Sequence, residues 1–128
     1  MEVDTGVVPD VRYRLDVARF DAAELTIHFA RHRADFVAVS ETEYEGLANR
    51  FLSGTLHSDL LQCTRKQGDI VRYNVATTEF GVLSSRGIIR TYFKAKPCAS
   101  LPPTAPKVGC HGYSDNLQYF KIECLRTW

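Results

Sequence analysis

The sequence of 128 residues lacks several features that would assign it to a familiar class. No stretch approaches the roughly 20 apolar residues that cross a bilayer. The acidic start lacks the charged-then-apolar pattern of a secretory signal. There is no glycine-rich phosphate loop, no GxSxG motif and no kinase motif, so the enzymes built on them are disfavoured. We therefore expect no membrane insertion and a cytoplasmic site of action.

Paired cysteine motifs are also missing, although four cysteines are present: Cys63, Cys98, Cys110 and Cys124. A zinc site needs closely spaced pairs of ligands, and only Cys110 and His111 are close neighbours. We therefore interpret the cysteines as free thiols in a reducing compartment. A Cys98–Cys110 bridge and a metal site are the two alternatives. No metal or other cofactor is predicted.

The composition is that of an ordinary globular domain, with 45% apolar and 24% charged residues. The net charge of +1 hides an asymmetry between the two halves of the chain. Residues 1–64 hold 6 basic and 11 acidic side chains, a net charge of −5, whereas residues 65–128 hold 10 and 4, a net charge of +6. This division favours a polyanionic partner for the second half. Neutralisation of one half by the other is the alternative.

Two helices are predicted in the first half, after an N-terminal arm or edge strand of residues 1–20. Each begins with a capping box, in which Asp21 or Ser40 is followed three residues later by glutamate. The apolar spacing extends these helices over residues 21–33 and 40–53. The second helix has the more regular apolar stripe.

The second half predicts a four-stranded antiparallel meander over residues 69–126, interrupted by a proline-rich insertion at 95–113. Its short β-branched and aromatic strands are residues 69–74, 79–84, 87–94 and 117–126. The predicted fold class is therefore α+β, with two N-terminal helices packed on one face of a four-stranded antiparallel β-meander. Residues 21–128 form a single domain.

The turn lengths predict a register for this sheet. A four-residue turn places Arg72 opposite Gly81, and a three-residue turn places Gly81 opposite Thr91. These three residues then share one face, where the bare glycine leaves room for a ligand. The other face is the expected seat of the helices, and it carries Val71, Tyr73, Phe80, Val82 and Tyr92. A bulge at Gly81 is the alternative, and it would bring Lys94 to the Arg72 face.

Cleavage of RNA without a metal requires a base, groups that hold the phosphate and an acid for the leaving oxygen. His28 and His32 lie four residues apart on one helix face, and histidine suits either proton-transfer role. Their HFARH motif lacks the glutamate of the HExxH zinc motif. Arg72 and Lys94 are the expected phosphate ligands, and Thr91 is the expected hydrogen-bond donor to the phosphate.

Five further residues are candidate contacts to the substrate. Arg90 can form a fork on phosphate oxygens, and tyrosines can stack on exposed bases. His111 lies in a loop that can close over a substrate. The candidate tyrosines are Tyr92, Tyr113 and Tyr119. A solvated strand arginine and ordinary core tyrosines are the alternatives for these positions.

Five motifs of the sequence resemble those of a known family: HFARH (28–32), GDIVRYN (68–74), EFGV (79–82), GIIRTYFK (87–94) and HGYxxNLxYF (111–120). Together they resemble the C-terminal toxin domains of bacterial polymorphic and contact-dependent inhibition systems, and related phage-borne nucleases. The resemblance covers about residues 25–124. Two departures are Arg86-Gly87, where the commoner form has an acid–glycine turn, and the long insertion before His111.

The resemblance implies the barnase, EndoU, colicin and RelE-like (BECR) nuclease fold. It also implies ribonuclease activity, often on tRNA, and a cognate immunity or antitoxin protein, with the histidine helix, Arg72, Thr91 and Lys94 in the active site. The sequence therefore predicts a metal-independent endoribonuclease toxin that cleaves RNA by attack of the 2′-OH. We also expect that this toxin domain can be delivered as the tail of a larger secreted protein. A non-catalytic RNA- or protein-binding module of the same fold is the alternative.

Overall fold

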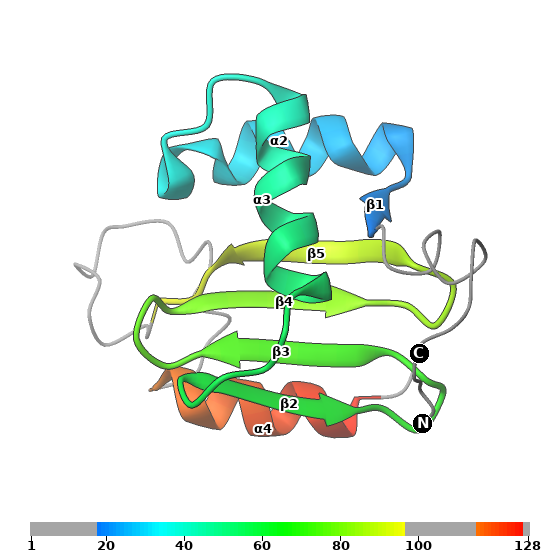
Figure 1. Cartoon of the computed structure of the whole chain (residues 1–128), viewed down its shortest axis with the longest axis vertical. Coiled ribbons are helices and arrows are strands. Elements are labelled where there is room, and N and C mark those ends of the chain that lie inside the picture. The colour runs from blue at the N-terminus through cyan, green and yellow to red at the C-terminus, as the bar shows by residue number, and fades with distance from the viewer. Residues whose placement is uncertain (1–17, 97–114, 127–128) are drawn as a thin grey trace.

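The computed structural model describes residues 18–96 and 115–126, which have an α+β arrangement of three helices and one five-stranded mixed sheet (Figure 1). The strand order is β1-β5-β4-β3-β2. The elements in chain order are β1 (Arg19–Phe20), α2 (Ala22–Phe36), α3 (Glu41–Ser53), β2 (Leu60–Thr64), β3 (Ile70–Asn74), β4 (Glu79–Leu83), β5 (Ile88–Lys94) and α4 (Asn116–Leu125).

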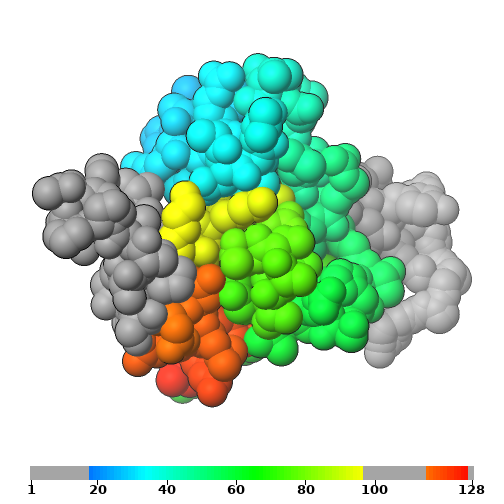
Figure 2. Space-filling view, turned by 90° about the vertical axis from the view of Figure 1, so that its left-hand side faces the viewer, coloured from blue at the N-terminus to red at the C-terminus, as the bar shows by residue number. Residues whose placement is uncertain are grey.

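The sheet lies between two helical layers. Strands β2 to β5 form an antiparallel meander, and the short β1 adds to it in parallel with β5. Helix α3 lies on one face and α4 on the other, and α2 runs along the β5 edge of the sheet (Figure 1). In the view turned by 90°, the yellow end of β5 lies between the cyan helical layer and the orange α4 (Figure 2).

The two predicted N-terminal helices are confirmed, but the capping box predicted at Asp21 is wrong, because the Asp21 side chain makes no capping hydrogen bond to α2. Ser40 caps α3 by accepting a hydrogen bond of 3.1 Å from the backbone N–H of Glu43, whose side chain accepts from the N–H of Val39 at 2.7 Å. Helix α2 continues to Phe36, three residues beyond the predicted end. It stops where Val37 adopts the left-handed conformation, with a φ of 52°.

The predicted last strand, residues 117–126, is wrong, because this segment is helix α4. Asp115 caps the helix by accepting a hydrogen bond of 2.7 Å from the backbone N–H of Gln118. Its apolar pattern is short enough to fit either a helix or a strand. The fourth strand of the meander is instead β2, which was not predicted and lies beside β3 at the opposite edge of the sheet, while the short β1 lies beside β5.

The predicted register is confirmed between β3 and β4, where Arg72 lies opposite Gly81. The turn into β5 also has the expected glycine in the left-handed region, since the φ of Gly87 is 83°. The predicted pairing of Gly81 with Thr91 is wrong. A bulge at Arg90 shifts the register, so that Gly81 lies opposite Tyr92 and Val82 lies opposite Thr91.

The two faces of the sheet are exchanged relative to the prediction. Helix α3 packs over the face that carries Arg72, Gly81 and Tyr92, in a core with Tyr44 and Leu52 that also receives apolar side chains of α2. The opposite face packs on α4, and the buried residues of this second core are Val71, Tyr73, Phe80, Val82, Phe93 and Ala95, together with Tyr119 and Phe120 of α4. Helices cover both faces of the sheet, so the more apolar character of one face could not show which face the N-terminal helices cover.

The interpretation of all four cysteines as free thiols is also wrong. Cys63 of β2 and Cys124 of α4 form a disulfide across a separation of 61 residues. Cys98 and Cys110, the pair considered for a bridge, lie outside the described residues. The disulfide fastens α4 to the strand at the edge of the sheet. Within residues 18–96 and 115–126, no helix is long and apolar enough to cross a membrane.

Candidate active site

A pocket of about 320 Å³ lies where α2, β5 and α4 meet. Four of the predicted site residues line it, and they come from all three elements: His28, Arg90, Thr91 and Tyr119. Val82 and Phe93 supply apolar lining from the sheet. The pocket therefore combines apolar walls with a few convergent polar groups, which is the usual character of a binding or active site.

His28 is the most unusual of the lining residues. Its side chain is 11% exposed, and Nε2 lies 3.4 Å from Oε1 of Glu24, one turn earlier on α2. Nδ1 is buried and has no hydrogen-bond partner among the described residues. Burial lowers the pKa of His28 below its ordinary 6.5, and Arg31 adds to this effect while Glu24 opposes it. The imidazole is therefore mainly neutral at neutral pH.

His32 lies on the same face of α2, as predicted, with its ring centroid 6.0 Å from that of His28. Its ring stacks on Phe93 at 5.1 Å, and His32 is buried. Only His28 of the pair lines the pocket. The structure therefore gives the two histidines different surroundings.

The bulge in β5 explains why Arg90 and Thr91 both reach the pocket. In a regular strand, neighbouring side chains point to opposite faces, and the extra residue interrupts this alternation. The Arg90 side chain is 44% exposed, and its Nε lies 3.0 Å from Oδ2 of the buried Asp69. The pocket thus gains a half-exposed guanidinium beside a hydroxyl.

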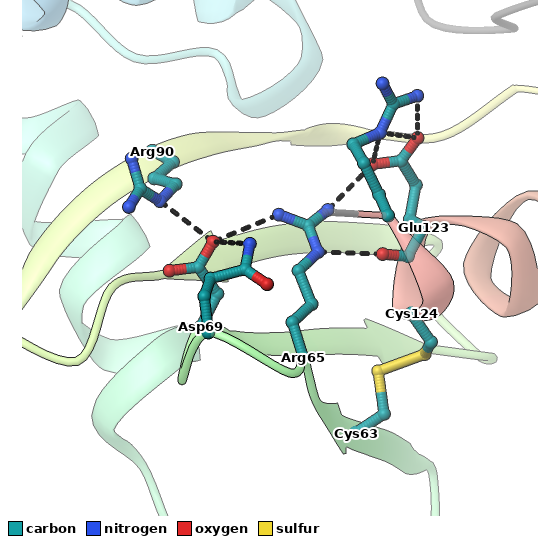
Figure 3. A network of polar contacts seen from close by, with 8 residues as sticks. Cys63, Arg65, Asp69, Arg90, Glu123 and Cys124 are labelled. Atoms are coloured by element: carbon teal, nitrogen blue, oxygen red, sulfur yellow. Dashed lines mark hydrogen bonds and ion pairs between the residues drawn. A yellow bond between two sulfur atoms is a disulfide. The ribbon is translucent and has the colours of Figure 1, made fainter. Parts of the chain in front are cut away.

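Three charged residues that line the pocket were not predicted from the sequence: Arg65, Glu123 and Arg126. The Arg65 guanidinium lies 2.8 Å from a carboxylate oxygen of Glu123, and Arg126 lies 2.6 Å from the other oxygen (Figure 3). Arg65 and Glu123 are 58 residues apart. No local sequence pattern links residues so far apart in the chain. The wrong assignment of residues 117–126 to a strand also misplaced Glu123 and Arg126.

Arg72, a predicted phosphate ligand, does not lie at this pocket. Its Nη1 donates to the backbone oxygens of Phe51 and Gly54, at 3.0 Å and 2.6 Å, and its Nε donates to Oε1 of Gln62 at 2.6 Å. The residue is buried, and burial lowers its pKa. Arg72 therefore bonds the last carbonyls of α3, which a helix leaves without partners, rather than facing an open surface.

Lys94 and Tyr92 also lie away from this pocket, on the Arg72 face of the sheet that α3 covers. The Tyr92 hydroxyl donates to Oε2 of Glu79 at 2.5 Å, and burial raises the pKa of Tyr92. The Tyr92 ring is fully buried, so it cannot stack on an incoming base. His111 and Tyr113 lie outside the described residues.

Tyr119 is brought to the pocket but is also a core residue. It is 6% exposed, and its ring packs 4.8 Å from that of Phe80. Tyr119 therefore contributes to the wall of the pocket rather than to an exposed stacking platform.

In the described ranges, 18–96 and 115–126, no three His, Cys, Asp or Glu side chains are grouped so that they could hold a metal ion. Neither the models of known protein families nor the curated proteins give a match to this sequence. The function is therefore argued from the pocket itself.

Proposed function

We propose that this protein is a metal-independent endoribonuclease and that the pocket between α2, β5 and α4 is its reaction centre. The observation that carries the proposal is the buried Nδ1 of His28, which has no hydrogen-bond partner among the described residues. His28 lines a pocket that also holds Arg90 and Thr91. Cleavage of RNA through its 2′-OH needs a base and groups that hold the phosphate, and this pocket offers an imidazole, a guanidinium and a hydroxyl for these two roles.

Glu24 prepares His28 to act as the base. A carboxylate beside Nε2 favours the tautomer with the proton on Nε2, because that N–H can then donate to the carboxylate. Nδ1 is left with its lone pair. The lowered pKa keeps His28 neutral at neutral pH, which is the state that a base needs before it can take the proton from a 2′-OH.

Arg90 and Thr91 are proposed to hold the scissile phosphate. A guanidinium can form two parallel hydrogen bonds to phosphate oxygens, and the charge stabilises the pentacoordinate transition state. The threonine hydroxyl supplies a further hydrogen bond. The half-exposed position of Arg90 leaves it accessible to a substrate that enters from solvent.

The reaction then proceeds by transesterification. The 2′-oxygen loses its proton to His28 and attacks the neighbouring phosphorus, and the bond from phosphorus to the 5′-oxygen breaks. The products are a 2′,3′-cyclic phosphate and a 5′-hydroxyl end. We assign the proton of the leaving oxygen to water, because His32 stacks on Phe93 and does not line the pocket.

The proposed partners are RNA, with tRNA as the expected substrate, and a cognate immunity or antitoxin protein. The cytoplasm remains the proposed site of action. The Cys63–Cys124 disulfide is in keeping with passage through an oxidising compartment, since such bridges are uncommon in proteins that remain in the cytosol. Delivery as the tail of a larger secreted protein would provide that passage.

The test is incubation of the purified chain with total cellular RNA in EDTA, followed by mapping of the new RNA ends. We expect discrete cuts that carry a 2′,3′-cyclic phosphate. A substrate with a single 2′-deoxynucleotide at a cut site should be resistant there, because the attacking hydroxyl is missing. Salt-dependent binding of RNA with no cut would instead support the non-catalytic binding module.

A further inference from the structure

A buried arginine organises the charged groups beside the pocket. Arg65 is 2% exposed, and each of its three side-chain nitrogens donates a hydrogen bond. Nε donates to the backbone oxygen of Glu123 at 2.7 Å, and Nη2 donates to its carboxylate at 2.8 Å. Nη1 donates to Oδ2 of Asp69 at 3.2 Å. Arg65 thus fixes one carboxylate on the sheet side and one on α4 (Figure 3).

Asp69 lies between Arg65 and Arg90. Its Oδ2 accepts from Arg65 and also lies 3.0 Å from Nε of Arg90. The Asp69 side chain is 2% exposed, whereas that of Arg90 is 44% exposed. An ion pair between two exposed side chains is loosely held and worth little. Here the carboxylate is shielded from water and already oriented by Arg65, so it defines where the Arg90 guanidinium can lie.

The nitrogen of Arg90 that meets Asp69 is also informative. Within the described residues, Arg90 makes its ion pair through Nε. The two terminal nitrogens therefore remain for a ligand with two oxygens. A lysine at this position would offer only one ammonium group, which could not hold Asp69 and also form a fork on a phosphate.

We infer that Asp69 is a positioning residue, which holds Arg90 through Nε so that its terminal nitrogens face the phosphate of a substrate in the pocket. This inference rests on the proposed function, because it concerns how the same pocket holds its phosphate. Arg65 has no contact with the substrate in this scheme. It orients Asp69 and balances its buried charge.

A double-mutant cycle separates positioning from a merely structural role. The variants are Asp69→Asn, Arg90→Gln and the combination, and the probe is a single-stranded 2′-O-methyl RNA, which binds but cannot be cleaved. In the parent, Asp69→Asn should weaken binding about 10-fold. With Arg90→Gln in place, it should change binding less than about 2-fold, because the residue that it positions is gone. Equal losses in the two backgrounds would overturn the inference.

Thermal unfolding supplies the contrasting readout. The loss of melting temperature caused by Asp69→Asn should be similar in both backgrounds, because it comes mainly from Arg65. Arg90→Lys is a second variant with little risk to folding, since position 90 is half exposed. It should keep the melting temperature and still bind the probe about 10-fold more weakly. Binding at the parent level by Arg90→Lys would contradict the fork.

A measurement on the unmodified protein needs no variant to fold. The Nε–H proton of Arg90 should exchange with solvent more slowly than that of Arg86, an exposed arginine of the neighbouring turn. Equal exchange rates would overturn the inference. A positive cycle in binding, together with no cleavage of unmodified RNA, would refute the proposed ribonuclease activity and leave the positioning role intact. No binding of the probe by the parent would refute both.

Discussion

Reduction of the Cys63–Cys124 disulfide should destabilise the protein substantially. The bridge spans 61 residues, and closing a loop of this length in the unfolded chain corresponds to about 4 kcal/mol of stability. For a domain of this size, such a loss lowers the melting temperature by roughly 10–20 °C. Dithiothreitol should therefore shift thermal unfolding, as followed by circular dichroism, by an amount in this range.

Reduction of the disulfide should destabilise α4 more than the other elements. The reduced helix keeps the packing of Tyr119 and the ion pair between Arg65 and Glu123, so it should remain folded but exchange its amide protons faster than the sheet. A variant with both bridge cysteines replaced by serine is the matched control. It should melt at the temperature of the reduced parent and show no response to dithiothreitol. An unchanged melting temperature of the parent on reduction would refute this reasoning.

Three further predictions concern the core and pH. Arg72→Ala should lower the free energy of unfolding by about 2–4 kcal/mol, because it leaves the last carbonyls of α3 unpaired, while RNA cleavage by the folded fraction stays unchanged. Gly81→Ala places a Cβ 3.1 Å from Leu52, so urea unfolding should report a loss of about 1–3 kcal/mol with no change in RNA binding. The third concerns His28, whose pKa is lower in the folded protein than the ordinary 6.5. The unfolded chain then takes up the proton first, so stability should fall as the pH drops through 6.5, and His28→Gln should flatten this dependence in urea titrations between pH 5 and 8.

The parts of the fold that could be predicted were those with local signals. The Ser40 capping box involves only four consecutive residues, and the left-handed conformation of Gly87 follows from the length of its hairpin turn. The pairing of Arg72 with Gly81 needed only the length of one turn. Such features depend on neighbours in the sequence, so propensity and spacing describe them well.

The errors came from contacts between distant segments. The alternation in residues 117–126 fits a strand, but the cap at Asp115 and packing against β3 favour a helix. Once that helix covers the second face of the sheet, only the first face is left for α3. Neither the disulfide nor the pairing of Arg65 with Glu123 has a local signature, since their partners lie about 60 residues apart.

The candidate site was therefore predicted only in part. The structure brings His28, Arg90, Thr91 and Tyr119 to one pocket. The expected partnership of Thr91 with Arg72 depended on a regular register, and the bulge at Arg90 breaks it. Bulges are common beside functional sites because they redirect side chains, and this one gives the pocket its exposed arginine.

The most direct test of the central claim is the single-turnover rate of RNA cleavage in EDTA for the parent, His28→Gln and Glu24→Gln, measured at the cut sites mapped in total RNA. The parent should produce 2′,3′-cyclic phosphate ends. His28→Gln should cleave about 100- to 10,000-fold more slowly, because it lacks the base. Glu24→Gln, which keeps a hydrogen-bonding group beside Nε2, should lose less than about 10-fold. Cleavage by His28→Gln at the parent's rate, or no cleavage by the folded parent, would contradict the assignment of this pocket as a ribonuclease centre.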